Sequence, residues 1–218
     1  MREDRDVAGR PGPTRTQDAE GTRRNILDVA TEEFAGKGYS GGRIDEIAAR
    51  TNTSKRMIYY YFRDKEGLYL AVLEEAYRRI RTIENTLDLE HLEPEEALKA
   101  LVGFTFDYQN ENQDFIRLVM VENIHHGEHL KKSRAIHDVN ATVIDKIKGL
   151  YQRGVAAGVF RKGIDPIDIH MSISALCFFN VSNRATFSLI FERDMDSARA
   201  LAKRRAIVVD TILRYVRG

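Results

Sequence analysis

The residues with the clearest chemical potential are basic, and they are concentrated in one short segment. From Arg50 to Lys65 the chain has five Lys or Arg side chains and one acidic side chain, Asp64, which gives a local charge of 5 − 1 = +4. The whole chain of 218 residues has 34 basic and 33 acidic residues, and its net charge is only +1. A polyanion such as DNA would therefore be bound by this local segment and not by the overall charge.

The sequence around these charges predicts two short helices joined by a polar turn, over residues 43–62. The first helix, residues 43–50, is too short to be stable without a partner helix. The turn, residues 51–54, consists of residues that favour turns and caps, and Ser54 or Thr53 would cap the second helix, residues 54–62. This arrangement is a helix-turn-helix, whose second helix lies in the DNA major groove.

The first turn of that second helix contains the residues that would contact DNA bases. An arginine in this position pairs bidentately with guanine, so Arg56 is the strongest candidate for base recognition. We expect Ser54, Lys55, Arg56 and Met57 to lie at this surface. Tyr59, Tyr60 and Tyr61 are consecutive and span roughly 200° of a helix, so at least one of them must pack or lie along the rim. We expect Tyr59 to be the main tyrosine contact to phosphate.

A second group with chemical potential is a cluster of one glutamate and three histidines. Glu122, His126 and His129 are spaced by four and three residues, as on a metal-binding helix, and His125 lies beside them. However, Gly127 is expected to end the helix and break this geometry, which would leave a solvated helix end. A metal-dependent enzyme is the less favoured alternative, since the sequence has no Gly-x-Ser-x-Gly, phosphate-binding glycine loop, His-Glu-x-x-His or Cys-x-x-Cys motif.

The spacing of apolar residues predicts an all-α protein with about nine helices, the last of which ends near Val216. Residues 1–21 are charged and rich in Gly and Pro, and we expect a flexible arm there. Residues 22–79 would form the DNA-binding domain and residues 80–218 a second helical domain. The expected helices cover residues 22 to a stop at 36 or 38, 43–50, 54–62, 64–80, 95–110, 115–124, 134–157, 166 to about 191, and 197–216.

The residues from Thr22 to Leu73 resemble the N-terminal domain of the TetR family of bacterial transcriptional repressors. The shared features are an Ile-Ala pair, the polar turn, a capped helix ending in Tyr-x-x-Phe, and Lys65 at the start of the next helix. The resemblance implies that Tyr59, Tyr61 and Lys65 contact backbone phosphates, and that Arg43 replaces a phosphate-binding threonine. Asn52 replaces the usual turn glycine and tolerates the same left-handed conformation. Arg56-Met57 replaces the usual Gly-Thr, which affects the expected base preference.

A single helix-turn-helix covers only one half-site, so we expect a homodimer on a palindromic double-stranded operator. The resemblance implies that the last two helices form the dimer interface. The candidate residues are Phe179, Phe187, Leu201, Val208, Ile212 and Tyr215, each of which is also compatible with an ordinary core position.

The resemblance also implies a small-molecule inducer that binds in the C-terminal domain and releases the repressor from DNA. Aromatic and isolated polar residues of this half are candidates to line the pocket, although an aromatic core is the simpler interpretation. They are Phe104, Tyr108, Phe115, Leu118, Met120, Asn123, Asn180 and Asn183. Control by a protein partner is the alternative. We expect no cofactor and a cytoplasmic location, since the sequence has one cysteine and no signal-peptide core.

Overall fold

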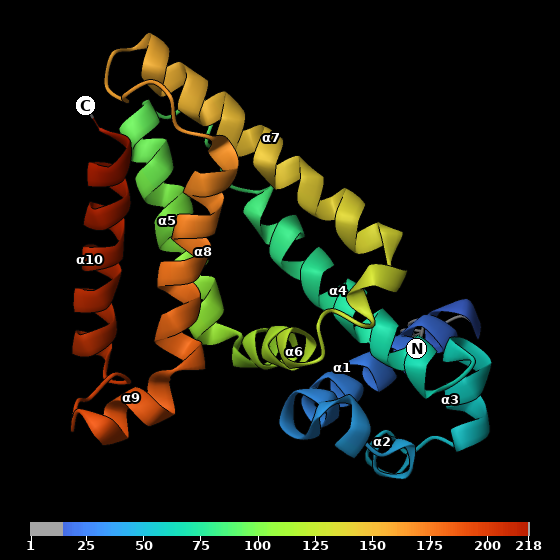
Figure 1. Cartoon of the computed structure of the whole chain (residues 1–218). Helices are drawn as coiled ribbons and strands as arrows, with labels where there is room; N and C mark the ends of the chain where they lie inside the picture. The colour runs from blue at the N-terminus through green and yellow to red at the C-terminus, as the bar shows by residue number, and fades with distance from the viewer. Residues whose placement is uncertain (1–14, 218) are drawn as a thin grey trace, which may run out of the picture.

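The computed structural model describes residues 15–217, and every regular element within this range is helical (Figure 1). This confirms the prediction of an all-α fold. The described helices are α1 (Arg15–Gly41), α2 (Ile44–Arg50), α3 (Lys55–Phe62), α4 (Lys65–Glu84), α5 (Pro94–Glu111), α6 (Gln113–Ile124), a 3-10 turn η1 (Leu130–Lys132), α7 (Arg134–Ala156), α8 (Pro166–Ser182), α9 (Arg184–Ile190) and α10 (Ala198–Val216).

Side-chain caps define where five of the described helices begin. The Ser54 hydroxyl accepts a hydrogen bond from the backbone N–H of Met57 at 3.2 Å, so Ser54 and not Thr53 caps α3. The Asp64 carboxylate accepts from the N–H of Gly67 at 2.7 Å and caps α4. Pro94 and Pro166 occupy first-turn positions of α5 and α8, where a missing N–H costs nothing. These local signals explain why the predicted starts agree with the structure.

Helix α1 begins earlier than the sequence pattern predicts. It is helical from Arg15, so the last seven residues of the predicted arm, 15–21, belong to a helix, and residues 1–14 lie outside the described residues. Extending an existing helix costs much less than nucleating one, which explains this extension by polar residues. At the other end, Gly38 has φ of 69° and interrupts the helical geometry, as the predicted stop requires.

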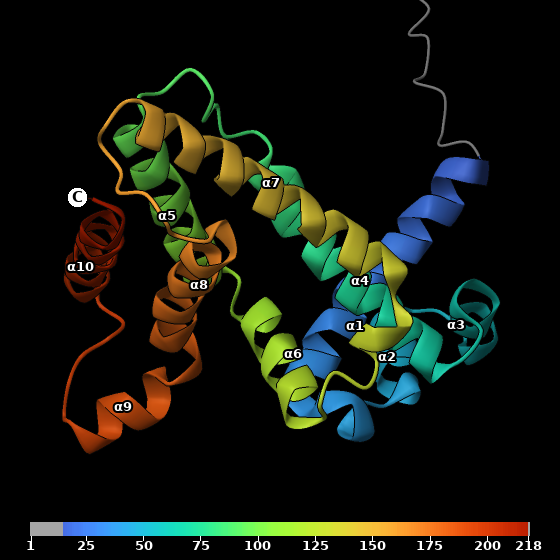
Figure 2. The same ribbon diagram turned by 45° about the horizontal axis from the view of Figure 1, so that its top comes forward.

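The predicted single helix over residues 166–191 is wrong, because the chain forms two helices that meet at Asn183. Asn183 is the C-cap of α8, with φ of −104° and ψ of 3°, and its side-chain oxygen accepts a hydrogen bond from Ser182 at 2.7 Å. Short polar side chains that bond locally compete with helix continuation. As a result α9 turns away from α8 and exposes three large apolar residues, namely Leu189, Ile190 and Phe191 (Figures 1 and 2).

The helices enclose two apolar cores. One core belongs to α1–α4 and also takes Leu118 from α6 and Ile136 from α7. The other belongs to α5, α7, α8 and α10. Figure 2 shows α7 lying along α4 and reaching from the second core toward the first. None of the helices in residues 15–217 has the length and apolar run needed to cross a membrane.

Candidate nucleic-acid interface and internal cavity

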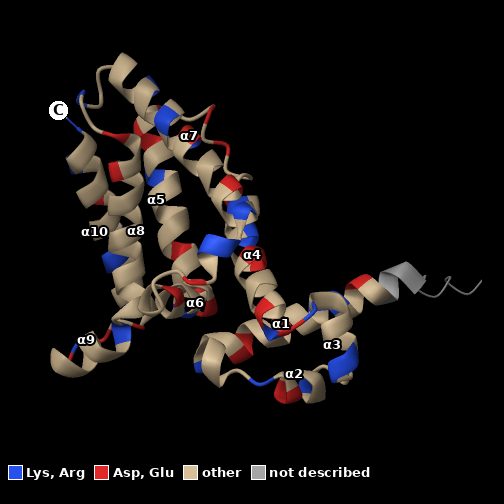
Figure 3. Ribbon diagram, turned by 45° about the vertical axis from the view of Figure 1, so that its right-hand side comes forward, with Lys and Arg blue, Asp and Glu red and all other residues tan. Residues whose placement is uncertain are grey.

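Helix α3 is anchored on one side and open on the other. Ile58 and Phe62 are buried in the core formed by α1–α4. The opposite side exposes Lys55, Arg56 and Met57, the three residues expected to contact bases. Basic residues occur in α3 and in the chain just before α2, on one edge of the molecule (Figure 3). The arrangement presents the first turn of α3 to a partner in the way that major-groove docking requires.

The turn before α3 has the geometry that the sequence predicts. Asn52 has a positive φ of 50°, so it adopts the left-handed conformation expected for a residue in place of glycine. The N–H of Thr53 donates to the carbonyl oxygen of Ala48 at 3.0 Å and closes the turn. The turn therefore fixes the angle between α2 and α3 with backbone hydrogen bonds.

The three consecutive tyrosines have different environments. Tyr60 is 79% exposed and Tyr59 is 41% exposed, whereas Tyr61 is half-buried and packs against the core of α1–α4. Tyr61 is thus the tyrosine that the helical geometry forces toward the protein. Its predicted contact to phosphate stays a prediction, as do those of Tyr59 and Tyr60.

Several basic side chains near α3, two of which (Lys55 and Lys65) are predicted DNA contacts, have partners within the chain. The Lys55 ammonium pairs with Asp45 of α2, and the Arg50 guanidinium pairs with Glu32 of α1. The Lys65 ammonium donates to the Ser40 carbonyl oxygen at 3.3 Å. These cations are therefore held close to the surface that α3 presents. Arg43 and Arg56, the other two cations expected to contact DNA, are exposed, and Arg43 lies at the start of α2.

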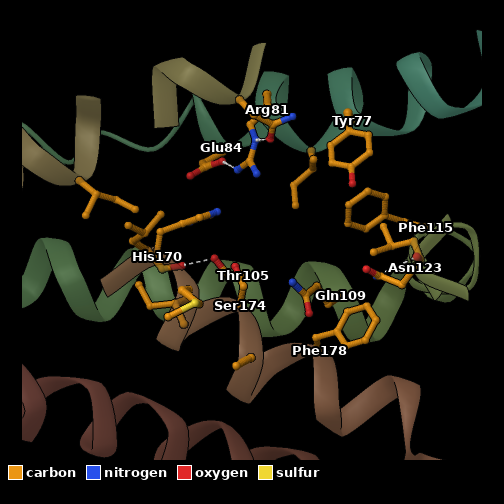
Figure 4. Close-up of a pocket in the computed structure, with 18 residues that line it drawn as sticks. Tyr77, Arg81, Glu84, Thr105, Gln109, Phe115, Asn123, His170, Ser174 and Phe178 are labelled. Carbon is orange, nitrogen blue, oxygen red and sulfur yellow. Dashed lines mark hydrogen bonds and ion pairs between the residues drawn. The ribbon is translucent and has the colours of Figure 1, made fainter. Parts of the chain in front are cut away.

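The C-terminal domain contains a cavity of about 600 Å³ among α4, α5, α6, α7 and α8 (Figure 4). This volume is in the range of sites that hold small organic molecules. Half of its 18 lining residues are apolar, and the other half carry a polar group. The polar lining residues are Tyr77, Arg81, Glu84, Thr105, Gln109, Asn123, Asn140, His170 and Ser174.

The charged groups in the cavity wall neutralise one another. Arg81 and Glu84 are both buried and form an ion pair, and the Arg81 Nε donates to the Asn140 Oδ1 at 3.0 Å. Burial, followed by the nearby Arg81 charge, lowers the pKa of His170 to about 4. The buried Oε1 of Gln109 has no hydrogen-bond partner among the described residues. A bound molecule would find an uncharged imidazole and an unsatisfied amide in this wall.

Of the eight predicted pocket residues, only Phe115 and Asn123 line this cavity. Leu118 lies instead in the core of α1–α4. Phe104 and Tyr108 contact each other, with ring centroids 5.7 Å apart, outside the cavity wall. Asn180 donates to Asn110 at 2.9 Å. Met120 and Asn183 also lie elsewhere.

Sequence reasoning missed most of the polar cavity residues. Arg81 and Glu84 are two opposite charges three residues apart, adjacent to Ile80 on the apolar stripe of α4. Charged residues are almost never fully buried unless they are paired, so this pair was a usable signal of a polar interior site. No such signal marks Gln109, His170 or Ser174, because their positions on one wall depend on how the helices pack.

Two of the six predicted dimer residues are buried in their own chain. Val208 and Ile212 are fully enclosed in the core of α5, α7, α8 and α10, so their assignment to an interface is wrong. The apolar stripe of α10, from which a dimer interface was predicted, packs instead against helices of its own domain. Leu201 and Tyr215 pack partly against that core. Phe179 is 41% exposed and contacts Phe187, with ring centroids 5.8 Å apart.

The histidine cluster does not form a metal-binding helix. His126 and Gly127 have positive φ values of 56° and 66° and end α6, as the glycine predicts. His125 and His126 are exposed, whereas His129 and Glu122 are buried together. No group of three metal-ligating residues comes together anywhere in the described part of the chain.

Two family models match the chain over the two regions described above. Residues 26–72 match "Bacterial regulatory proteins, tetR family", and residues 94–212 match "Tetracyclin repressor-like, C-terminal domain". The chain belongs to the TetR family. It is 36% identical to the HTH-type transcriptional repressor NicS of Pseudomonas putida, over 93% of this chain and 96% of that protein.

Solved structures of other transcriptional regulators have the same fold. SCO4942 of Streptomyces coelicolor, described as a transcriptional regulator, is 26% identical with a TM-score of 0.68, over 89% of this chain and 98% of that one. FadR of Bacillus subtilis, solved in complex with stearoyl-CoA, is 18% identical with a TM-score of 0.68, over 88% and 97% of the two chains. This TetR-family chain is accordingly a transcriptional regulator, and its helix-turn-helix is the DNA-binding unit of the family.

Proposed function

We propose that the protein is a dimeric transcriptional repressor that binds a palindromic operator through α3 and is released by a small molecule. The observation that carries this proposal is the position of the cavity. Its wall includes α4 and α6, and both helices also pack against the core of the DNA-binding domain. A molecule in the cavity would therefore contact the elements that hold α3 in place.

The homodimer is supported by an apolar surface on α8, α9 and α10. A single DNA-binding domain makes few phosphate contacts, and a two-fold dimer doubles them on a palindrome. Exposed apolar patches of this kind mark association surfaces. The exposed members of this surface include Phe179, Phe191 and Ile207, which Phe187 connects through ring contacts and a shared pocket, and α9 also exposes Leu189 and Ile190.

The cavity favours a small-molecule inducer over a protein partner as the regulatory signal. A fully filled domain would have favoured the protein partner, and a cavity of about 600 Å³ favours an organic ligand. FadR, which has the same fold, was solved with stearoyl-CoA bound. We assign the protein no catalytic role. Because its target is operator DNA, we place it in the bacterial cytoplasm.

The test is to select bound duplexes from a random-sequence DNA library with the purified chain. We expect a two-fold symmetric consensus, bound by a species with twice the chain mass in sedimentation. A consensus without two-fold symmetry would contradict the dimeric repressor, and the absence of any consensus would contradict sequence-specific binding. The selected duplex then serves for screening molecules that release it.

A further inference from the structure

Helix α6 faces both the cavity and the DNA-binding domain. Phe115, Val119 and Asn123 line the cavity. On a neighbouring face, Leu118 and Glu122 are buried, and Leu118 belongs to the core of α1–α4. A helix moves as a stiff element, so a ligand that displaces the cavity-lining face of α6 also displaces the face that packs on the core of α1–α4.

Glu122 is the buried polar residue on the second face, and its carboxylate organises the segment that follows α6. Its Oε2 accepts hydrogen bonds from the backbone N–H groups of His129 at 3.2 Å and Leu130 at 3.1 Å. Its Oε1 lies 2.9 Å from the His129 Nδ1. Three hydrogen bonds therefore attach residues 129–130 to the end of α6.

The His129 ring continues the contact into the DNA-binding domain. It is buried against Tyr39, with ring centroids 4.4 Å apart, and against Tyr69 at 4.8 Å. The Lys65 ammonium lies 5.0 Å from the Tyr39 ring centroid, within the range of a cation–π contact, and also bonds to the Ser40 carbonyl oxygen. An unbroken series of contacts therefore leads from the cavity wall to a cation expected to bind DNA.

We propose that Glu122 and His129 are positioning residues that couple the occupancy of the cavity to the placement of the Lys65 ammonium. The inference rests on the proposed function. When a ligand displaces α6, Glu122 carries His129 with it, the Tyr39 ring shifts, and Lys65 loses the support that aims it at a phosphate. Phosphate contacts carry no sequence information, so this coupling weakens binding on every DNA sequence.

The test measures DNA affinity as a function of KCl concentration, on a library-selected duplex and on a random one. Lys65→Ala removes one phosphate contact, so the slope of log affinity against log salt decreases in magnitude by about 1. We expect Glu122→Gln to lower the affinity about three- to tenfold and to flatten the slope by the same ~1. We also expect the double variant to bind no more weakly than Lys65→Ala alone. The matched controls are Glu128→Gln and His125→Gln, exposed residues of the same turn, which should leave both quantities unchanged.

A purely structural role for Glu122 would give a different result. Additive losses in the double variant, with an unchanged salt slope for Glu122→Gln, would overturn the proposal. If circular dichroism shows that Glu122→Gln does not fold, Tyr39→Leu replaces it, with the same expectations. If the protein selects no DNA consensus, the proposed function is refuted. If the protein binds DNA but the losses are additive and the salt slope of Glu122→Gln is unchanged, only the present inference is refuted.

The link between the cavity and Lys65 is tested with Ser174→Trp. Ser174 lies on α8, so the substitution adds volume to the cavity wall and leaves the sequence of α6 unchanged. We expect it to flatten the salt slope in the wild-type background and to have no effect on the slope in the Lys65→Ala background. A slope that Ser174→Trp leaves unchanged in both backgrounds would overturn the link between cavity and Lys65.

Discussion

The exposed residues in the first turn of α3 offer different interactions to a base pair. Arg56 has a planar group with several donors, which matches the two acceptors of guanine, whereas Met57 offers only apolar contact. Lys55 is a point charge that is already paired with Asp45. Base recognition should therefore depend mainly on Arg56, and Lys55 should contribute general attraction.

We predict that Arg56→Ala relaxes the preference at one position of each operator half-site. The loss of a bidentate contact corresponds to about 1–3 kcal/mol of discrimination between guanine and the other bases. The measurement is binding of wild type and variant to a set of duplexes that differ at single positions. Lys55→Ala is the control, since it should weaken all duplexes about equally. An unchanged preference at every position in Arg56→Ala would exclude this role.

The half-buried His170 predicts a pH dependence of stability. Its pKa is lowered to about 4 by burial and by Arg81, whereas in the unfolded chain it is about 6.5. Between these values the unfolded chain binds a proton that the folded chain does not, so stability decreases as pH falls below about 6.5. Urea unfolding at neutral pH and near pH 5 measures this change. Between the two pH values the free energy of unfolding should decrease less for His170→Gln than for wild type. His137→Gln, which changes an exposed histidine, should behave like wild type, and an equal decrease in all three proteins would refute the prediction.

At the scale of helices, the sequence predicted the helix starts that are determined by local signals. Ser54, Asp64, Pro94 and Pro166 mark helix starts by caps or by a missing N–H, and the structure has helices starting there. The break at Asn183 and the extension of α1 to Arg15 were not predicted. Apolar spacing runs through the break without interruption, and helix extension depends on neighbouring helical residues more than on composition.

Apolar spacing was equally unable to separate core from cavity and interface. Val208 and Ile212 have the same periodic positions that an interface stripe would have, but they are buried in their own domain. Leu118 and Phe115 both lie on α6, yet only Phe115 faces the cavity. Which side of an apolar helix meets which neighbour is decided by tertiary packing. The exposed first turn of α3 was easier to predict, because its residues are contiguous in sequence, and their contacts to DNA stay a prediction.

Two glycines in helices should respond in opposite ways to alanine. A Cβ at Gly67 in α4 would lie 2.1 Å from the Phe62 carbonyl oxygen, whereas one at Gly149 in α7 would meet no heavy atom within 4 Å. We expect Gly67→Ala to lower the free energy of unfolding by about 1–3 kcal/mol, because the backbone of the α3–α4 connection must shift. Gly149→Ala should raise it by about 0.5–1 kcal/mol, through helix propensity. Denaturant unfolding measures both, and a stabilising Gly67→Ala would show that this close contact is absent.

For the whole molecule, the apolar patch on α8–α10 predicts how the protein assembles. Ile207 of α10 is 43% exposed and lies near Phe179 and Phe187, in the wall of one pocket. We expect Ile207→Glu to convert the dimer to a monomer in sedimentation and to lower operator affinity strongly, because a charge buried at an interface without a partner is costly. Ile83→Glu is the control, since Ile83 is equally exposed, at 46%, but lies on α4. A dimer that survives Ile207→Glu would place the interface elsewhere.

The ion pairs beneath α3 also affect how DNA binding should be interpreted at the level of the whole protein. When a phosphate takes Lys55 from Asp45, the freed carboxylate stays fixed on the protein and attracts a mobile cation, which offsets the cation that the DNA releases. The salt dependence of affinity reports the net number of mobile ions released. A salt titration of this protein should therefore report fewer phosphate contacts than the complex contains, by up to one for each internally paired cation. Lys65, whose partners are a carbonyl and a ring, is counted in full.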